Sequence, residues 1–219
     1  MIRPTLIANG MCLFLAVAAR AQECRNSRVY VMLDGRDTVS VERLQFGPTE
    51  FRDAVTILDQ KAYTTFSGRL NSRGGVDGLA TSVWEHVGDT AHAATQTAHV
   101  TFTNRAILAM VDDGFGHSQA QVDSVSTATL PYMDNLLLFL EIVNTKGRLS
   151  GRDSVQTPIA WLFTVGRHEM VTYRKTGVQS SRLTFTDFSV EITIGIDRGI
   201  DRAARSDGVV FVRTGCTDR

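Results

Sequence analysis

Ser118 and His168 are the residues of this sequence that come closest to forming a nucleophilic pair. A serine attacks a carbonyl carbon only when a histidine takes its proton and a carboxylate orients that histidine. Asp134 and Asp153 both lie between the two in the chain, so the order serine, aspartate, histidine is present. A serine hydrolase that uses Ser118 is therefore one interpretation of the sequence.

The residues around Ser118 argue against that interpretation. Gly116–Ala120 reads GHSQA and departs at its fifth position from the G-x-S-x-G turn of α/β-hydrolases. In those enzymes the turn leads from a strand into a helix, whereas Gln121–Thr127 is rich in valine, serine and threonine, which is typical of a strand. We therefore expect a surface loop here, and we assign no catalytic residue.

Three histidines, His86, His92 and His99, lie within 14 residues and would suit zinc if they shared one face. His86 and His92 flank a turn at Gly88-Asp89, but His99 has the opposite parity to His92 on the strand that follows. Neither a His-x-His pair nor a nearby cysteine supports them. We expect no metal site, and because no glycine-rich stretch separates a strand from a helix, we expect no nucleotide or other cofactor.

The elements that carry these residues are mostly strands, because apolar and polar residues alternate and turn signals recur at short intervals. Between Ala93 and Thr103, for example, threonines and His99 alternate with Ala98, Val100 and Phe102. This pattern predicts a half-buried strand with one solvated face, or, if the interior of the sheet is wet, a polar stripe that lines it. In Thr38–Phe46 the parity of the apolar residues switches, which predicts a bulge near Glu42–Arg43.

One segment, Pro131–Lys146, breaks the strand pattern. It opens with proline and is followed by Gly147, which suits the first helical position and the position just past a helix end. Apolar residues cover nearly all of its faces, so such a helix must be buried. A core helix is the main interpretation, and a membrane-associating helix is the alternative.

We predict a mainly β (α+β) fold, a curved antiparallel sheet or half-barrel of about ten to twelve strands with one buried helix. Strand twist accumulates in a sheet of that width, so the sheet curls and leaves a concave interior where a ligand can bind. Four large or polar residues, Trp84, His99, Phe139 and Trp161, are the predicted ligand-binding residues. Core packing is the alternative role for both tryptophans.

The first 21 residues are expected to be a signal peptide, and residues 22–219 a single β-rich domain. Arg3 supplies a basic start, Met11–Ala19 is apolar, and Ala19-Arg20-Ala21 fits the small-x-small cleavage pattern. The apolar stretch is too short to span a bilayer, and no later run reaches the length of a transmembrane segment. The mature protein is therefore expected in the periplasm or outside the cell.

Cleavage after Ala21 would leave two cysteines, Cys24 and Cys216, one near each end of the mature chain. In an oxidising compartment this arrangement favours a disulfide bridge between them. Two separate thiols are the alternative, because the sequence does not show whether the two Cα atoms come within bridging distance.

Charge and composition exclude some partners. The chain of 219 residues has 23 basic and 23 acidic residues, and its arginines are scattered rather than clustered. A neutral balance of this kind argues against nucleic acid as a partner. A lipophilic small molecule or another envelope protein remains the expected partner.

Three short stretches carry a resemblance. Leu33–Leu44 reads LDGRDTVSVERL, Leu130–Tyr132 reads LPY before the helix, and hairpins close the chain. These resemble uncharacterised exported bacterial β-rich proteins that open with a similar strand pair. The inferred shape is also similar to that of periplasmic lipoprotein carriers, an open half-barrel with a helical lid. The resemblance implies export and a β-rich fold, and it assigns no activity.

Three functions follow as expectations. The first is an exported, non-enzymatic binding or carrier protein for an apolar or amphipathic small ligand. The second is a structural or interaction module of the cell envelope without a small ligand, which would have a filled interior and an exposed apolar patch or sheet edge. The third is the hydrolase built on Ser118.

Overall fold

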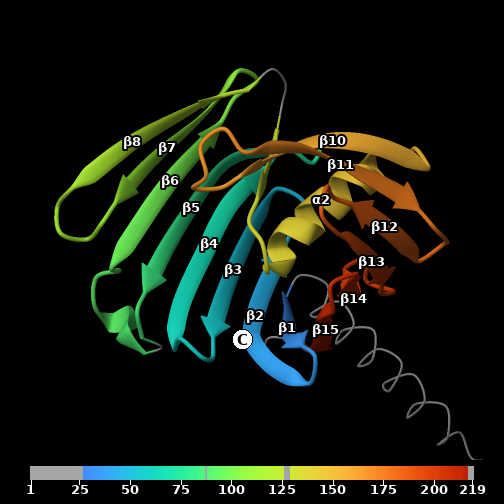
Figure 1. Cartoon of the computed structure of the whole chain (residues 1–219), viewed down its shortest axis with the longest axis horizontal. Helices are drawn as coiled ribbons and strands as arrows, with labels where there is room; N and C mark the ends of the chain where they lie inside the picture. The colour runs from blue at the N-terminus through green and yellow to red at the C-terminus, as the bar shows by residue number, and fades with distance from the viewer. Residues whose placement is uncertain (1–26, 87, 126–128, 217–219) are drawn as a thin grey trace, which may run out of the picture.

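The structure, a computed structural model, describes residues 27–86, 88–125 and 129–216. Its strands form one 15-stranded sheet in the order β8-β7-β6-β5-β4-β3-β2-β1-β15-β14-β13-β12-β11-β10-β9 (Figure 1). The first eight strands are β1 (Ser27–Asp34), β2 (Asp37–Phe46), β3 (Glu50–Ile57), β4 (Ala62–Leu70), β5 (Val76–Trp84), β6 (Gln96–Phe102), β7 (Ala106–Asp112) and β8 (Ser118–Ser124). The others are β9 (Leu130–Tyr132), β10 (Ser154–Trp161), β11 (His168–Lys175), β12 (Ser180–Thr184), β13 (Ser189–Ile194), β14 (Ile200–Arg205) and β15 (Val209–Gly215). Neighbouring strands are antiparallel except β9 and β10, which are parallel.

The path of the chain forces this sheet to curl. The chain begins in the middle of the sheet at β1, reaches one edge at β8, and resumes at the opposite edge with β9. Fourteen spacings of about 4.8 Å would make a flat sheet of this width about 67 Å across. The six steps from Ser124 to Leu130 span at most about 22 Å. The two edges must therefore approach each other, and the sheet wraps into the curved shape seen in Figure 1.

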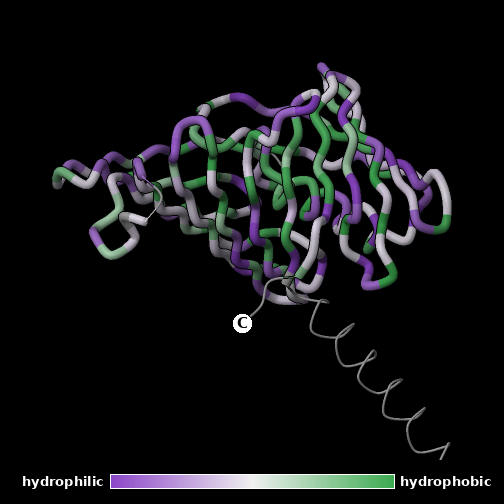
Figure 2. The backbone as a smooth tube through the Cα atoms, turned by 90° about the horizontal axis from the view of Figure 1, so that it is seen from below, coloured by the Kyte–Doolittle hydropathy of each residue, from purple (hydrophilic) through white to green (hydrophobic). Residues whose placement is uncertain are grey.

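The concave side of the sheet holds the helix α2 (Leu137–Leu149), which forms the centre of the core (Figure 1). Phe139 is fully buried, and its ring meets the ring of Phe66 on β4 edge to face at 5.7 Å. Tyr132 on β9 packs against Trp161 on β10, with ring centroids 4.9 Å apart. Hydrophobic and hydrophilic residues are interleaved along the strands, as Figure 2 shows, because successive side chains point to opposite faces. The predicted mainly β fold, curved sheet and buried helix are confirmed.

The helix begins and ends later than the sequence predicted. Pro131 lies in β9, where it pairs with Ala160, and the helix starts only at Leu137. Gly147 lies inside the last turn rather than beyond it. It fits there because an added Cβ would lie 2.2 Å from the Tyr173 ring, so packing against β11 requires glycine at this position.

The predicted strand count of ten to twelve is wrong, since the sheet has 15 strands. Two strands had misleading sequences. Pro131 and Tyr132, at the start of the predicted helix, lie in β9, and Ile200–Arg205 forms β14 although its sequence lacks a regular apolar alternation. The bulge in β2 is also displaced from its predicted place, because the register shifts between Met32 and Leu33 of β1, opposite Val39.

Within the described residues, no helix has the length and hydropathy needed to span a membrane.

Candidate functional site

A half-enclosed cavity of about 230 Å³ lies between the inner face of β1–β4 and Met133–Leu136, the segment that leads into α2. Its floor is apolar and includes Met32, Val55, Ile57, Phe66 and Leu136. These strand residues face inward because they share the parity of the buried side of each strand. The bulge at Val39 brings both Val39 and Ser40 to the cavity wall.

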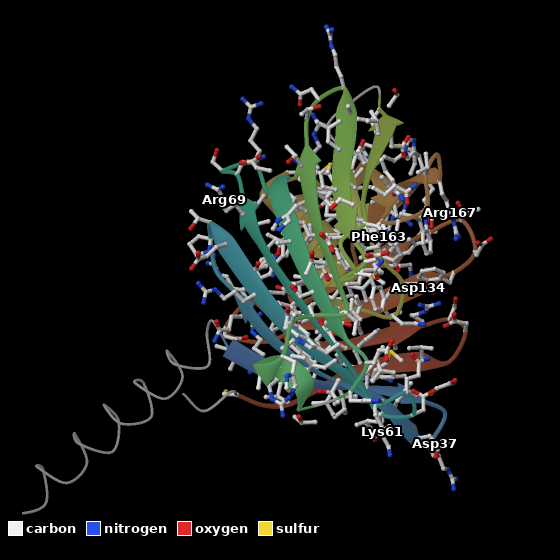
Figure 3. The ribbon with its side chains drawn as sticks, turned by 90° about the vertical axis from the view of Figure 1, so that its left-hand side faces the viewer. Asp37, Lys61, Arg69, Asp134, Phe163 and Arg167 are labelled. Atoms are coloured by element: carbon white, nitrogen blue, oxygen red, sulfur yellow. The ribbon has the colours of Figure 1, made fainter. Side chains whose placement is uncertain are left out.

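The mouth of the cavity is polar, with Asp59, Gln60, Asp134 and Asn135 on its rim. Asn135 has φ = 59°, in the left-handed region that asparagine tolerates better than most residues. Two of the rim side chains, Asp134 and Asn135, bind the guanidinium of Arg205 on β14. These contacts connect the rim to β14, in the C-terminal half of the sheet. In Figure 3, Asp134 lies above Lys61 and Asp37, which mark the β3–β4 and β1–β2 turns.

Below the cavity, Glu42 of β2 caps the start of α2. Its two carboxylate oxygens accept hydrogen bonds from the backbone N–H groups of Leu137 and Leu138, at 2.8 and 2.7 Å. The helix has no side-chain cap of its own, because Leu136 occupies the capping position. A carboxylate from the sheet therefore satisfies two unpaired donors and faces the positive end of the helix dipole.

Asp53 on β3 is a second carboxyl group beside Glu42, and both are almost fully buried. Burial raises the pKa of Glu42 to about 7, although its two backbone hydrogen bonds oppose that rise. Burial, and then the negative charge of Glu42, raise the pKa of Asp53 well above its ordinary value. When the pair holds a single proton, that proton therefore lies on Asp53, and Glu42 is the ionised acceptor of the two backbone N–H groups.

Two further polar residues of α2 tie the helix to the sheet. Glu141 accepts a hydrogen bond from the backbone N–H of Ile200 at 3.1 Å, and Arg28 lies 3.8 Å from its carboxylate. Asn144 accepts a hydrogen bond from the hydroxyl of Ser181 at 2.8 Å. Together with Glu42, these contacts fix both the position and the rotation of α2, and hence the wall of the cavity.

Trp84 and His99 lie on the outer, convex face of the sheet. Trp84 has the opposite parity to the buried Leu79 and Thr81. Its ring lies beside that of Tyr63, with centroids 5.7 Å apart, and it donates a hydrogen bond to the His92 carbonyl at 3.2 Å. His99 is exposed between the buried Ala98 and Val100, which matches a half-buried strand with a solvated outer side. It borders a broad, open depression on that face, where Gly78 has no side chain.

Phe139 and Trp161 lie on the inner side, but they do not share a cavity. Phe139 belongs to α2 and is fully buried in the core. Trp161 lines a small cavity of about 30 Å³ beneath the loop between β10 and β11, and Arg167 covers its ring at 3.6 Å. The structure therefore does not bring the four predicted ligand-binding residues together around one cavity.

Ser118 and His168 are also far apart in the structure. The Ser118 hydroxyl donates a hydrogen bond to Asp112 at 3.1 Å, whereas His168 Nε2 lies 2.7 Å from Asp123 Oδ2. Five strand residues, about 17 Å, separate Ser118 from Asp123. Among the described residues no cluster of three His, Cys, Asp or Glu side chains has the geometry to hold a metal ion. The signal segment and Cys24 lie outside the described residues, so cleavage after Ala21 and the bridge to Cys216 stay predictions.

Three residues near the cavity, Ser40, Glu42 and Asp53, were not among the predicted site residues. The sequence holds a signal for Asp53, since it has the parity of the apolar Phe51 and Val55 on the same strand. Glu42 has the parity of the buried Leu44, two residues further along β2, so it faces the same side of its strand. Both were treated as ordinary polar residues because a buried carboxylate needs a partner, and its partner, the helix start, is about 95 residues away.

No protein-family model matches this sequence, and no curated protein matches it. The structure is similar to the crystal structure of a DUF1089 family protein from Pseudomonas aeruginosa, determined at 1.80 Å resolution, with a TM-score of 0.52 and 9% sequence identity. The likeness covers 85% of this chain and 95% of that one. At this identity it concerns the fold alone. The chain is therefore a mainly β protein whose large curved sheet and single described α-helix are arranged like those of that DUF1089 family protein.

Proposed function

We propose that this chain is an exported, non-enzymatic carrier of an amphipathic small ligand, and that the ligand binds in the cavity between β1–β4 and Met133–Leu136. The observation that carries the proposal is the cavity itself, with an apolar floor and a polar rim around about 230 Å³. An apolar cavity of about 150 Å³ already holds benzene, so by proportion this one accepts on the order of ten non-hydrogen atoms. A longer ligand would extend through the open mouth.

The polar groups near the cavity support a binding role rather than catalysis. Glu42 is engaged by two backbone N–H groups of α2, and Asp134 is paired with Arg205. A general base must reach the proton it removes, and a nucleophile needs a base beside it. Ser118 has neither arrangement with His168, because Ser118 begins β8 whereas His168, on β11, contacts Asp123 near the other end of β8.

Native mass spectrometry of the protein purified under mild conditions tests the proposal. We expect an adduct of small mass that is removed by organic solvent, and displacement of the apolar fluorescent probe N-phenyl-1-naphthylamine by the extracted compound. A protein that carries no adduct and does not bind the probe at micromolar concentration would contradict it.

Export is part of the same proposal and has its own test. The mature protein from a periplasmic fraction should begin at Gln22, and its intact mass should fall by two hydrogens relative to the reduced form if Cys24 and Cys216 are bridged. A chain that still carries residues before Gln22 would contradict cleavage after Ala21.

A second candidate function, contact with another envelope protein, is favoured by an apolar patch on the outer face at the β8 edge. Leu108, Met110 and Val122 are 42%, 51% and 62% exposed there. Contiguous exposed apolar residues commonly mark an interaction surface. If this function is correct, the wild-type chain should capture a partner protein from envelope extract. The Met110→Asp variant should no longer capture that partner, whereas Thr65→Asp, which places the same charge elsewhere on the outer face, should still capture it.

A further inference from the structure

The hydroxyl of Ser40 is an unsatisfied polar group in the cavity wall. Ser40 is 3% exposed, it lines the cavity, and its Oγ has no hydrogen-bond partner among the described residues. A buried hydroxyl without a partner costs about 1 to 3 kcal/mol. Such a cost is removed when a ligand supplies the missing hydrogen bond.

The depth of Ser40 locates that hydrogen bond. Ser40 pairs with Ile57 across β2 and β3, and Ile57 is two residues before Asp59 on the rim. Leu58 and Asp59 belong to the turn after β3, and two residues span at most about 7 Å, so Ser40 lies just below the mouth. A ligand whose tail fills the apolar floor would place its head group between Ser40 and the rim.

The rim favours a positive head group. Asp134 and Asp207 share one guanidinium, that of Arg205, whose other side is covered by the Phe188 ring at 4.0 Å. Asp59 forms no ion pair with any described residue, and its carboxylate accepts only the neighbouring N–H of Gln60. The rim therefore carries two carboxylates, of which Asp134 is paired with Arg205 and Asp59 is not, and Gln60 and Asn135 add acceptor oxygens.

We infer that this cavity selects an amphiphile with an ammonium head group, which donates one hydrogen bond to Ser40 and faces the carboxylate of Asp59. An ammonium group has three donors, whereas a carboxylate offers only acceptors and would be repelled by the rim. The inference rests on the proposed carrier function and specifies its ligand class.

The test compares three probes of one chain length, decylamine, 1-decanol and decanoate, each displacing N-phenyl-1-naphthylamine at pH 7 below its micelle concentration. We expect decylamine to bind at least tenfold more tightly than decanoate, with decanol between them. Equal affinities, or tighter decanoate, would overturn the ammonium preference and leave the carrier function standing. Failure of the protein to bind the fluorescent probe or any of the three would overturn both.

Two variants separate the head-group contacts from the fold. Asp59→Lys should lower the ratio of decylamine to decanoate affinity at least fivefold. Asp153→Lys, with the same charge change beyond the far end of α2, should leave the ratio unchanged. Ser40→Ala should weaken decylamine at least threefold with an unchanged or higher melting temperature, because it removes an unpaired buried hydroxyl. Unchanged decylamine binding in both Asp59→Lys and Ser40→Ala would contradict the assignment.

Discussion

His168 Nε2 lies 2.7 Å from Asp123 Oδ2, and this contact joins strands from opposite ends of the sheet. The same carboxylate oxygen accepts a hydrogen bond from the backbone N–H of Gly166 at 3.0 Å. Asp123 is on the edge strand β8, Gly166 lies in the β10–β11 connection, and His168 is the first residue of β11. No strand pairs across this gap within the described sheet, so the two side chains hold the loop over the small cavity at Trp161.

Asp123→Ala should release this loop while leaving most of the core intact. We expect faster amide hydrogen exchange in residues 162–168 and a loss of about 0.5 to 1.5 kcal/mol in the free energy of unfolding, because the two hydrogen bonds are partly exposed. Asp113→Ala is the matched control, since Asp113 also binds a histidine, His117, at 2.9 Å, but within a local turn. Equal exchange of the loop in both variants would contradict a linking role for Asp123.

The carboxyl pair Glu42 and Asp53 makes stability depend on pH. Both pKa values are raised in the folded protein, that of Glu42 to about 7, so folding binds protons that the unfolded chain has released. The free energy of unfolding should therefore fall as pH rises from about 5 through 7, by on the order of 3 kcal/mol for Glu42 alone. Urea titrations at pH 5, 6, 7 and 8 measure this decline.

Asp53→Asn should make that profile flatter. The amide does not titrate, and it removes the repulsion between two buried charges. We expect the variant to be more stable than the wild type at pH 8 and to lose less stability between pH 5 and 8. Asp153→Asn, which changes an exposed carboxylate, should keep the wild-type dependence of the free energy of unfolding on pH. A wild-type slope in Asp53→Asn would show that the pair is not the source.

Gly147→Ala should destabilise the protein although alanine ordinarily favours a helix by about 1 kcal/mol. The new Cβ would lie 2.2 Å from the Tyr173 ring, so either α2 or β11 must move. We expect a loss of about 1 to 3 kcal/mol, measured by chemical unfolding. Gly215→Ala, where an added Cβ meets nothing within 4 Å, should be neutral. A stabilised Gly147→Ala variant would mean that the contact of α2 with β11 is looser than described.

The alternation of apolar residues was sufficient to predict a curved antiparallel sheet with one buried helix. It was not sufficient for strands whose sequences resemble other elements. Pro131 is typical of a helix start, yet it occupies a three-residue strand at the sheet edge, where a missing N–H is tolerated. Ile200–Arg205 has only two buried side chains, so its inward face was hidden by the charged residues around it.

The candidate site was less predictable, because it depends on contacts between distant parts of the chain. Among the aromatic residues predicted to bind the ligand, Trp84 faces outward and Phe139 fills the core. The cavity is lined instead by ordinary strand residues, such as Val55 and Thr64, together with the segment before α2. No local pattern indicates which inward side chains meet a helix and which meet empty space.

The most direct measurement compares Thr64→Trp with Thr65→Trp. The two threonines are neighbours on β4, and of the two only Thr64 lines the cavity, since successive strand residues point to opposite faces. We expect Thr64→Trp to weaken binding of N-phenyl-1-naphthylamine at least tenfold, while Thr65→Trp binds like the wild type and both variants keep a cooperative unfolding transition. Wild-type binding by the folded Thr64→Trp variant would show that the ligand does not bind in this cavity.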